Sequence, residues 1–257
     1  TVPWVAFVDA DYRDSQRNIV HLSQAGLSID REYYLSADSR STQQREYLRA
    51  TMGQLLALAG YTDAATMATD GIALEAQLAR IQNSNVDNRD VERTYNITTH
   101  SQLVSDTPEL FTGLQLAALG IAADYPVNVM QPEYLRQLRQ VFHQTDVAGW
   151  RKYLAARVVL HYAELLSDDF TAVVSAYDIQ RGLYQVRPPQ WQLAIAYLND
   201  NVGMLLGKLY VDAYFDDGIK ADVTAITDAI KEEYRLSISA SDRLGSETRR
   251  SALHKLD

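Results

Sequence analysis

The sequence predicts a mainly α-helical fold, an irregular array of many helices with a short strand region at the N-terminus. Three observations lead to this prediction. Apolar residues recur at helical spacing along most of the chain, capping residues, glycines and prolines punctuate these stretches, and no fixed-period repeat links them. With 257 residues, of which 47% are hydrophobic, the chain can bury a sizeable core.

The N-terminus predicts a single short strand. The stretch from Trp4 to Val8 is apolar and partly β-branched, and Asp9 and Asp11 then interrupt it, which suits a strand better than a helix. A lone strand requires a partner, and the only comparable stretch is the weak Val127–Val129. We therefore expect the pairing strand to lie outside this sequence.

The pattern divides the chain into a strand and loop lead-in over residues 1–40 and a helical domain over residues 41–257. The first helix of this domain begins at a capping box formed by Ser41 and Gln44 and ends before Gly60. Its apolar face consists of Leu48, Met52, Leu55 and Ala59. The second helix begins near Asp63, and its apolar face consists of Met67, Gly71, Leu74, Leu78 and Ile81.

Shorter helices are expected in the middle of the chain. Thr107 and Pro108 form a good cap and first-turn pair for a helix that Gly120 closes. Pro132 opens the next helix, whose apolar residues are Leu135, Leu138 and Phe142. Asp146 then caps a longer helix, the clearest core helix in this region. Its apolar stripe consists of Val147, Trp150, Leu154, Val158, His161 and Leu165.

The longest helix is expected in the last third of the chain. A helical stretch from Asp168 to about Ile179 precedes it, and the Pro188-Pro189 pair breaks that stretch and starts the next helix. Its apolar residues are Trp191, Ile195, Leu198, Val202, Leu205 and Leu209. This long pattern predicts a helix that runs through the centre of the domain. Further helices follow around Ile226 and from Glu247.

Composition argues against several classes of partner. A net charge of −9 without a cluster of Lys and Arg argues against binding to a phosphate backbone, so no nucleic acid partner is expected. No apolar run approaches the roughly 20 residues that span a bilayer, and no signal-peptide pattern begins the chain, so no membrane contact by this segment is expected. The absence of cysteine fits a cytoplasmic or an extracellular protein equally well.

No recognised catalytic motif occurs in the sequence. The sequence contains no glycine-rich phosphate loop, no G-x-S-x-G elbow and no H-E-x-x-H zinc helix. Two His–carboxylate pairs have helical spacing, His143 with Asp146 and His161 with Glu164, and each could hold one edge of a metal site. Neither pair has a third ligand in view. We therefore interpret His161 as a buried histidine on an apolar stripe, and His143 as a surface residue near a helix C-terminus.

Other conspicuous residues have structural interpretations. The pairs Asp168-Asp169 and Asp216-Asp217 look like acid pairs, but neighbouring residues point in different directions, and helix capping explains them better. Tyr33-Tyr34 could stack on a ligand, although such residues more often fill a half-buried interface. The sequon Asn96–Thr98 matters only in a secretory eukaryotic context. The residue pattern therefore assigns no catalytic residue and no metal ligand.

Several short stretches follow a known family pattern in order and spacing. The first is QAGLSIDREYY, from Gln24 to Tyr34. The others are Glu75 with Leu78-Ala79, Arg89-Asp90 followed by Tyr95-Asn96, Pro132–Leu135, Trp150–Leu165, Arg187–Trp191, Asn199–Gly203, Gly207–Val211 with Phe215, and Glu247–Leu256. Together they cover nearly the whole chain, which resembles the neprilysin and endothelin-converting-enzyme family of zinc metallopeptidases.

The resemblance implies an internal, N-terminal-region segment of a zinc metalloendopeptidase that hydrolyses small peptides. In that family an H-E-x-x-H helix and a downstream Glu bind zinc, and this motif lies beyond residue 257. No catalytic or metal residue therefore carries over to this segment, its substrate-binding residues stay unknown, and zinc belongs to the parent protein. The helices would form a cap over the catalytic zinc domain of the same chain and restrict the access of peptide substrates to the active-site chamber.

Departures from the family pattern leave alternatives open. Asp30 stands where proline is usual, Arg243 or its neighbours stand where a tryptophan is usual, and the empty cysteine positions put any disulfide in doubt. One alternative is a stand-alone helical interaction or scaffold domain without peptidase activity. Another is a separate enzyme with a metal at His161 and Glu164. By the primary interpretation, the segment alone is inactive and exposes the apolar surface that meets the catalytic half.

Overall fold

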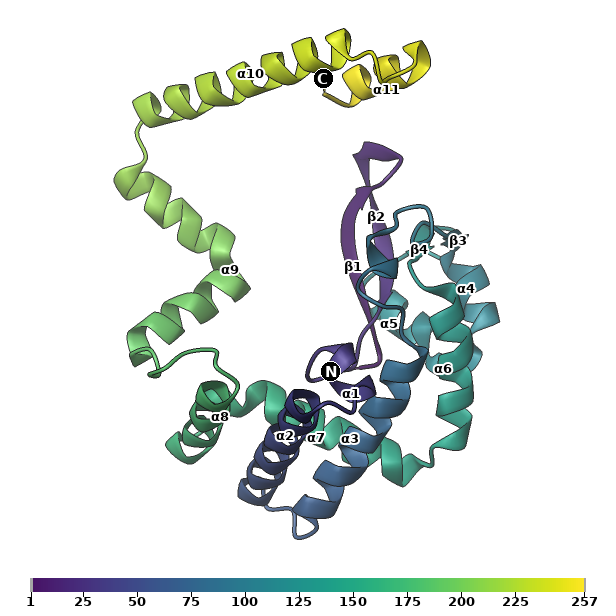
Figure 1. Ribbon diagram of the computed structural model, residues 1–257, viewed down its shortest axis with the longest axis vertical. Coiled ribbons are helices and arrows are strands. Elements are labelled where there is room, and N and C mark those ends of the chain that lie inside the picture. The colour runs from purple at the N-terminus through teal and green to yellow at the C-terminus, as the bar shows by residue number, and fades with distance from the viewer. Residues whose placement is uncertain (1, 257) are drawn as a thin grey trace. The chain divides into compact units, whose positions relative to one another are not determined.

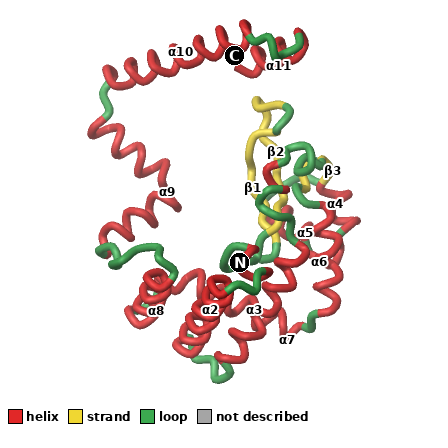
Figure 2. Tube along the Cα trace, in the orientation of Figure 1, coloured by secondary structure: helices red, strands yellow, loops and turns green. Residues whose placement is uncertain are grey.

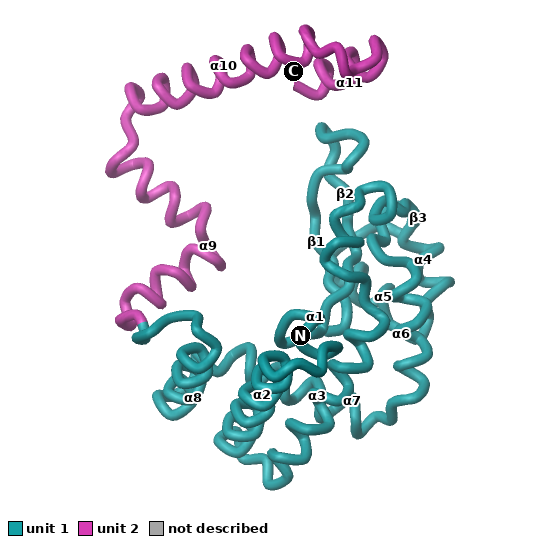
Figure 3. The backbone as a smooth tube through the Cα atoms, viewed as in Figure 1, with its two compact units in different colours: residues 1–187 teal, residues 188–257 magenta. Residues whose placement is uncertain are grey.

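The chain folds mainly into helices, and the predicted fold class is confirmed. The structure is a computed structural model that describes residues 2–256, in which eleven α-helices and a four-stranded sheet occur (Figure 1). The chain divides into two compact units, Thr1–Arg187 and Pro188–Asp257 (Figure 3). All four strands belong to the first unit, and the second unit consists of helices and their connections.

The four strands form one mixed sheet (Figure 2). They are β1 (Trp4–Asp11), β2 (Asp14–Gln24), β3 (Ile97–Thr99) and β4 (Pro126–Val129), in the order β1-β2-β4-β3. β1 and β2 are an antiparallel hairpin, β2 pairs with β4 in parallel, and β3 pairs with β4 in antiparallel fashion. The weak apolar stretch at 127–129 is therefore a strand at the centre of the sheet.

The expectation that the first strand pairs outside this sequence is wrong. β1 pairs with β2 along most of its length, from Trp4 opposite Gln24 to Ala10 opposite Asn18. β2 was not predicted because its first five residues are polar and exposed, and only its second half supplies buried residues. An exposed ribbon needs no buried face, so it lacks the alternation that identifies a strand.

Eight helices and three single turns of 3-10 helix complete the first unit. The helices are α1 (Arg31–Leu35), α2 (Ser39–Leu58), α3 (Ala64–Ile81), α4 (His100–Asp106), α5 (Thr112–Ala118), α6 (Pro132–Gln144), α7 (Val147–Tyr162) and α8 (Asp168–Gln180). The turns are η1 (Asp87–Arg89), η2 (Pro108–Leu110) and η3 (Ala163–Leu165). One core lies between the sheet and the helices, where Leu22 and Val127 join Leu78, Tyr134 and Tyr153. A second core joins α2, α3 and α7.

Side-chain caps determine where several of these helices begin, among them α2 and α7. Asp38 caps α2, since its carboxylate accepts a hydrogen bond from the Ser41 backbone N–H at 2.8 Å. The predicted capping box at Ser41 and Gln44 is therefore wrong, because the helix begins one turn earlier than the apolar pattern does. Asp146 caps α7 as predicted, accepting from the Gly149 N–H at 2.7 Å.

The predicted helix between Thr107 and Gly120 is two separate elements. Phe111 adopts a left-handed backbone conformation with φ of 55°, which separates η2 from α5. Gly120 has φ of 74° and follows the end of α5, as expected for a helix that closes at a glycine.

The buried face of α7 differs from the predicted one. Tyr153 and Ala156 are buried, and Ala156 lies against Gly71 of α3, where a small residue lets the two helices approach closely. Leu154 and Val158, from the predicted stripe, are exposed. The helix carries apolar residues on more than one side, so spacing alone could not select the face that packs.

The second unit contains α9 (Gln190–Tyr214), α10 (Asp217–Ala240) and α11 (Ser246–Leu256). α9 is interrupted at Val202, whose φ of −136° and ψ of 29° are not helical. None of the three helices has a buried residue. The prediction that the longest helix runs through the centre of a domain is therefore wrong for this structure, since its apolar residues lie at the surface.

Candidate functional site

The segment from Gln24 to Tyr34 joins the hairpin to the helices of the first unit. Gly26 has φ of 94°, and a Cβ atom there would lie 2.6 Å from the Tyr153 hydroxyl oxygen and 2.9 Å from Cα of Pro3. Tyr153 donates its hydroxyl hydrogen to the Gly26 carbonyl oxygen at 2.9 Å. Both the backbone conformation and the lack of space therefore require glycine at this position.

Gln24 fixes the start of this segment. Its side-chain amide donates to the Asn83 carbonyl oxygen at 3.0 Å and accepts from the Asn83 N–H at 2.8 Å. Its own backbone N–H donates to Oε1 of Gln131 at 2.9 Å. The end of β2 is thus tied to the loop after α3 and to the residue that precedes α6.

A buried carboxylate holds the middle of the segment. Glu75 of α3 is fully buried, and it accepts hydrogen bonds from the Tyr34 hydroxyl and from the Ser28 hydroxyl, the latter at 2.7 Å. The Ser28 N–H donates to the other carboxylate oxygen at 3.2 Å. Nη1 of Arg157, from α7, donates to Oγ of Ser28 at 2.7 Å and lies 3.5 Å from the carboxylate.

Burial dominates the electrostatics of this cluster. It raises the pKa of Glu75, and hydrogen bonds from Tyr34 and Ser28 together with the positive charge of Arg157 act in the opposite direction. Burial and the adjacent carboxylate also raise the pKa of the Tyr34 hydroxyl far above its usual range. Because the carboxylate is closed off from solvent and its three partners come from the Gln24–Tyr34 segment and from α7, it positions backbone elements and does not face a ligand.

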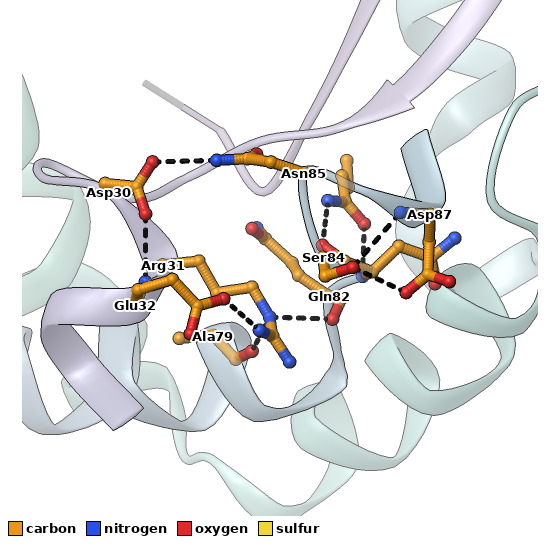
Figure 4. Close-up of polar contacts among 10 residues, drawn as sticks. Asp30, Arg31, Glu32, Ala79, Gln82, Ser84, Asn85 and Asp87 are labelled. Carbon is orange, nitrogen blue, oxygen red and sulfur yellow. Dashed lines mark hydrogen bonds and ion pairs between the residues drawn. The ribbon is translucent and has the colours of Figure 1, made fainter. Parts of the chain in front are cut away.

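The second half of the segment is fixed by Arg31 and Asp30 (Figure 4). Nε of Arg31 donates to the carbonyl oxygens of Ala79 and Gln82, each at 3.0 Å. Asp30 caps α1 by accepting from the Glu32 N–H at 3.0 Å, and it also accepts from the Asn85 side chain at 2.9 Å. The aspartate that stands where a proline is usual therefore has a local function at the helix start.

His143 is a surface residue in the last turn of α6, as the sequence predicts. Its side chain is 64% exposed, and Nε2 lies 3.5 Å from Oε1 of Glu109. Glu109 also accepts two hydrogen bonds from Arg139, at 2.9 and 2.8 Å, which lowers the pKa of the Glu109 carboxyl to about 2. His143 thus contacts an arginine-paired carboxylate, which is a surface arrangement.

His161 is exposed, so the prediction of a buried histidine is wrong. Its ring packs edge-on against Tyr162 with 4.7 Å between the ring centres. His161 belongs to the apolar stripe that was predicted to be the buried face of α7. This stripe faces solvent, so the histidine is exposed with it. Across residues 2–256, no three His, Asp or Glu side chains come together as metal ligands.

The remaining candidates have structural surroundings. Asp216 caps α10 and accepts from the Ile219 N–H at 2.9 Å, which confirms its predicted capping role. Asp168 and Asp169 lie in the first turn of α8, where the helix dipole favours negative charge, but neither is the N-cap residue. Tyr34 is buried, and its neighbour Tyr33 is half-buried.

Two further surfaces remain, and the first of them was not identified from the sequence. The first is a cavity of about 560 Å³ between β3, the end of α4 and α6, with Leu103, Val129 and Leu135 among its apolar lining and Asp106 and Arg136 among its polar lining. Its residues come from three separate parts of the chain, so no local pattern could indicate it. Asn96 of the sequon is also in its wall, and its side-chain amide donates to the Arg93 carbonyl oxygen at 2.9 Å.

The second surface consists of apolar residues on α9 and α10. Large apolar side chains there are exposed along both helices: Trp191, Ile195, Tyr197, Leu198, Val202, Met204, Leu205, Leu209, Tyr210, Val211, Tyr214, Ile219, Val223, Ile226, Ile230, Tyr234 and Leu236. We call this set the apolar helix surface. Despite it, no helix within residues 2–256 combines the length and the apolar content that crossing a membrane requires.

Comparison with known sequences identifies the family. The N-terminal profile of peptidase family M13 matches residues 1–257, the whole chain. The chain belongs to peptidase family M13. The resemblance carried by segments such as Gln24–Tyr34 is thereby confirmed.

Curated relatives are much longer than this chain. Endothelin-converting enzyme 1 of Mus musculus is 27% identical over 98% of this chain and 34% of that protein. Endothelin-converting enzyme-like 1 of Homo sapiens is 29% identical over 97% of this chain and 33% of that protein. The chain therefore spans about a third of the length of these M13 proteins.

Two solved structures share the fold. The zinc metalloprotease Zmp1 of Mycobacterium tuberculosis, in complex with an inhibitor, is 28% identical over 99% of this chain and 39% of that chain, with a TM-score of 0.83. PepO from Lactobacillus rhamnosis has a TM-score of 0.85 at 24% identity over 99% of this chain and 41% of that chain, which shows a common fold.

Proposed function

We propose that this chain is the helical, non-catalytic cap of a neprilysin-like zinc metalloendopeptidase that hydrolyses small peptides. In this proposal the rest of the polypeptide supplies the catalytic zinc domain, and the cap restricts access to the active-site chamber. Membership of family M13 and coverage of about a third of its relatives support this division of labour.

The apolar helix surface is the observation that carries the proposal. Leu209 and Tyr214 are 67% and 72% exposed, and they belong to a set that extends along both α9 and α10. Covering one large apolar side chain stabilises a protein by about 1.5–3 kcal/mol. Exposed apolar patches of this kind mark interaction surfaces. A second part of the same polypeptide would cover this one permanently.

Within residues 2–256, the histidines and carboxylates do not come together as a zinc site. The exposed His161 and the glutamate-paired His143 each lack the further ligands that zinc requires. Zinc, where bound, polarises a carbonyl group and activates water for peptide hydrolysis. In the proposed arrangement this chain contributes the wall of the chamber, and the ligands and the general base come from the catalytic domain.

Opening and closing of the cap would admit peptides. Zmp1 of Mycobacterium tuberculosis has been solved in an open state and in a partially open state, and both resemble this chain, with TM-scores of 0.79 and 0.73. We infer that the cap of this protein moves in the same way. A chamber that opens only partly would accept flexible peptides and reject folded proteins.

Size selection by the full-length gene product tests this function. The proposal predicts cleavage of a short fluorogenic peptide, loss of cleavage with a zinc chelator, and no cleavage when the same peptide forms part of a stably folded domain. Equal rates on the free and the folded sequence would contradict the cap role. A gene that encodes no H-E-x-x-H motif after this region would favour the stand-alone interaction domain instead.

A further inference from the structure

β1 has an open edge in the first unit. It lies at one end of the strand order and pairs with β2 on one side only, and no other strand of residues 2–256 adjoins it (Figure 2). Ala25 donates its N–H to the Pro3 carbonyl oxygen at 2.9 Å, which defines this pair as hydrogen-bonded. Hydrogen-bonded and non-bonded pairs alternate in an antiparallel ladder. The backbone groups of Trp4, Ala6 and Val8 therefore point away from β2.

The first half of this edge, from Trp4 to Val8, lacks the features that normally prevent pairing. Val5, Phe7 and Val8 are 43%, 38% and 63% exposed, and β1 contains neither lysine nor proline. The register shifts only at its far end, between Ala10 and Asp11. Proteins usually protect an open edge with charge, proline or a bulge, because unpaired N–H and C=O groups recruit other strands. The stretch from Trp4 to Val8 is apolar and carries no such protection, whereas Asp9, Asp11 and the register shift protect the far end. The first half of β1 is therefore suited to permanent pairing.

We propose that β1 receives an extended strand from the catalytic part of the same polypeptide, which hydrogen-bonds to the outward backbone groups of Trp4, Ala6 and Val8. This inference rests on the proposed function. The matched M13 relatives continue for about two thirds of their length outside the region that this chain covers, so such a strand is available without a second molecule. Apolar side chains on that strand would cover Val5 and Phe7.

Hydrogen–deuterium exchange of the full-length protein tests the pairing. In an open β1, only Val5, Phe7 and Asp9 donate to β2, and the amides of Trp4, Ala6 and Val8 exchange within seconds. The proposal predicts that these three amides are protected for minutes or longer, at every protein concentration and without added peptide. Fast exchange of the three amides would overturn it.

Two substitutions at Val8 provide a matched pair. Val8→Pro removes an outward N–H and leaves every β1–β2 hydrogen bond in place, so an open edge would tolerate it. Val8→Thr keeps the N–H and the β-branched shape. In full-length protein we expect Val8→Pro to speed exchange of the Trp4 and Ala6 amides by about fivefold or more, the effect of losing one hydrogen bond, and Val8→Thr to leave it unchanged. Equal exchange in both variants would contradict the pairing.

The remaining outcomes separate this inference from the proposed function. Protection that appears only at high protein concentration would assign the edge to a second copy, and protection that requires added peptide would assign it to substrate. Either result overturns the proposed strand. If the full-length protein cleaves peptides while the β1 edge exchanges freely, the peptidase function stands and only this inference fails.

Discussion

The hydroxyl of Tyr153 donates to the carbonyl oxygen of Gly26 at 2.9 Å, although 127 positions separate the two residues in sequence. This contact fastens the end of the hairpin to α7, and the tyrosine ring is fully buried in the core beneath the sheet. Gly26 lies in the QAGLSIDREYY stretch that carries the family resemblance. Close packing against Tyr153 therefore explains why this stretch has a glycine at position 26.

Gly26→Ala should destabilise the protein strongly. The new methyl group would meet the Tyr153 hydroxyl and the Pro3 backbone, and alanine would have to adopt a left-handed conformation. Together these effects should lower the free energy of unfolding by about 2–4 kcal/mol. Gly60→Ala is the control, because Gly60 has φ of 91° but open space around it, so only about 1–2 kcal/mol should be lost. Equal losses in denaturant titrations would refute the steric argument.

Removing the Glu75 carboxylate should also be costly. Glu75→Ala leaves the largely buried Arg157 and the Tyr34 hydroxyl without their shared acceptor. Breaking a buried pair in this way should lower the free energy of unfolding by about 3–5 kcal/mol. Glu46→Ala removes an exposed ion pair with Arg49 and should cost about 0–1 kcal/mol. A Glu75→Ala variant as stable as the Glu46→Ala variant would show that the buried cluster does not hold the segment.

Stability should fall in acid partly through Asp11. Hydrogen bonds from Arg17, from the Arg13 backbone and from Tyr95 lower the folded-state pKa of Asp11 from 3.8 to about 2. The folded state therefore binds this proton more weakly than the unfolded state. The stabilisation from Asp11 is fully present above pH 3.8 and is lost as the pH falls through about 2.

Asp11→Asn should flatten the stability curve over this pH interval and lower stability at neutral pH. Chemical denaturation at a series of pH values measures both effects. Asp124→Asn, at an exposed position, serves as the control. If the free energy of unfolding of both variants depends on pH as it does in the wild type, the Asp11 contacts do not contribute to acid sensitivity.

Leu209→Asp should destabilise the full-length protein, because the proposed catalytic domain covers the apolar helix surface. Burying a carboxylate against apolar side chains costs several kcal/mol, so we expect thermal inactivation of peptide cleavage at a clearly lower temperature. Leu114→Asp on α5 is the control, since Leu114 is 71% exposed, close to the 67% of Leu209, but lies outside that surface. Identical inactivation temperatures for the two variants would argue against coverage of α9.

Local signals in the sequence predicted much of the fold. Asp146, Pro132 and Gly60 mark helix ends through capping and backbone conformation, which depend on neighbouring residues only, and the structure confirms each of them. The choice of buried face on α7 depends on which helix packs against it, and this is a property of the whole fold. Apolar residues on several sides of that helix therefore led to the wrong assignment of His161.

The candidate site could be predicted less well than the helix ends, because residues far apart in the sequence form it. Nothing in the spacing of Ser28, Glu75 and Arg157 indicates that they meet, since they lie in a loop, in α3 and in α7. β2 was missed because an exposed ribbon carries no apolar alternation. The family resemblance marked Gln24–Tyr34 as important, and only the structure shows that this segment is where hairpin and helices join.

Zinc content and peptide cleavage of the purified chain of residues 1–257, measured beside the full-length protein, test the central claim most directly. After incubation with excess Zn²⁺ and desalting, we expect the chain to retain no stoichiometric zinc and to cleave no fluorogenic peptide, while the full-length protein does both. Stoichiometric zinc on the chain together with chelator-sensitive cleavage would contradict a non-catalytic cap, and would make His161 and Glu164 the first ligands to substitute.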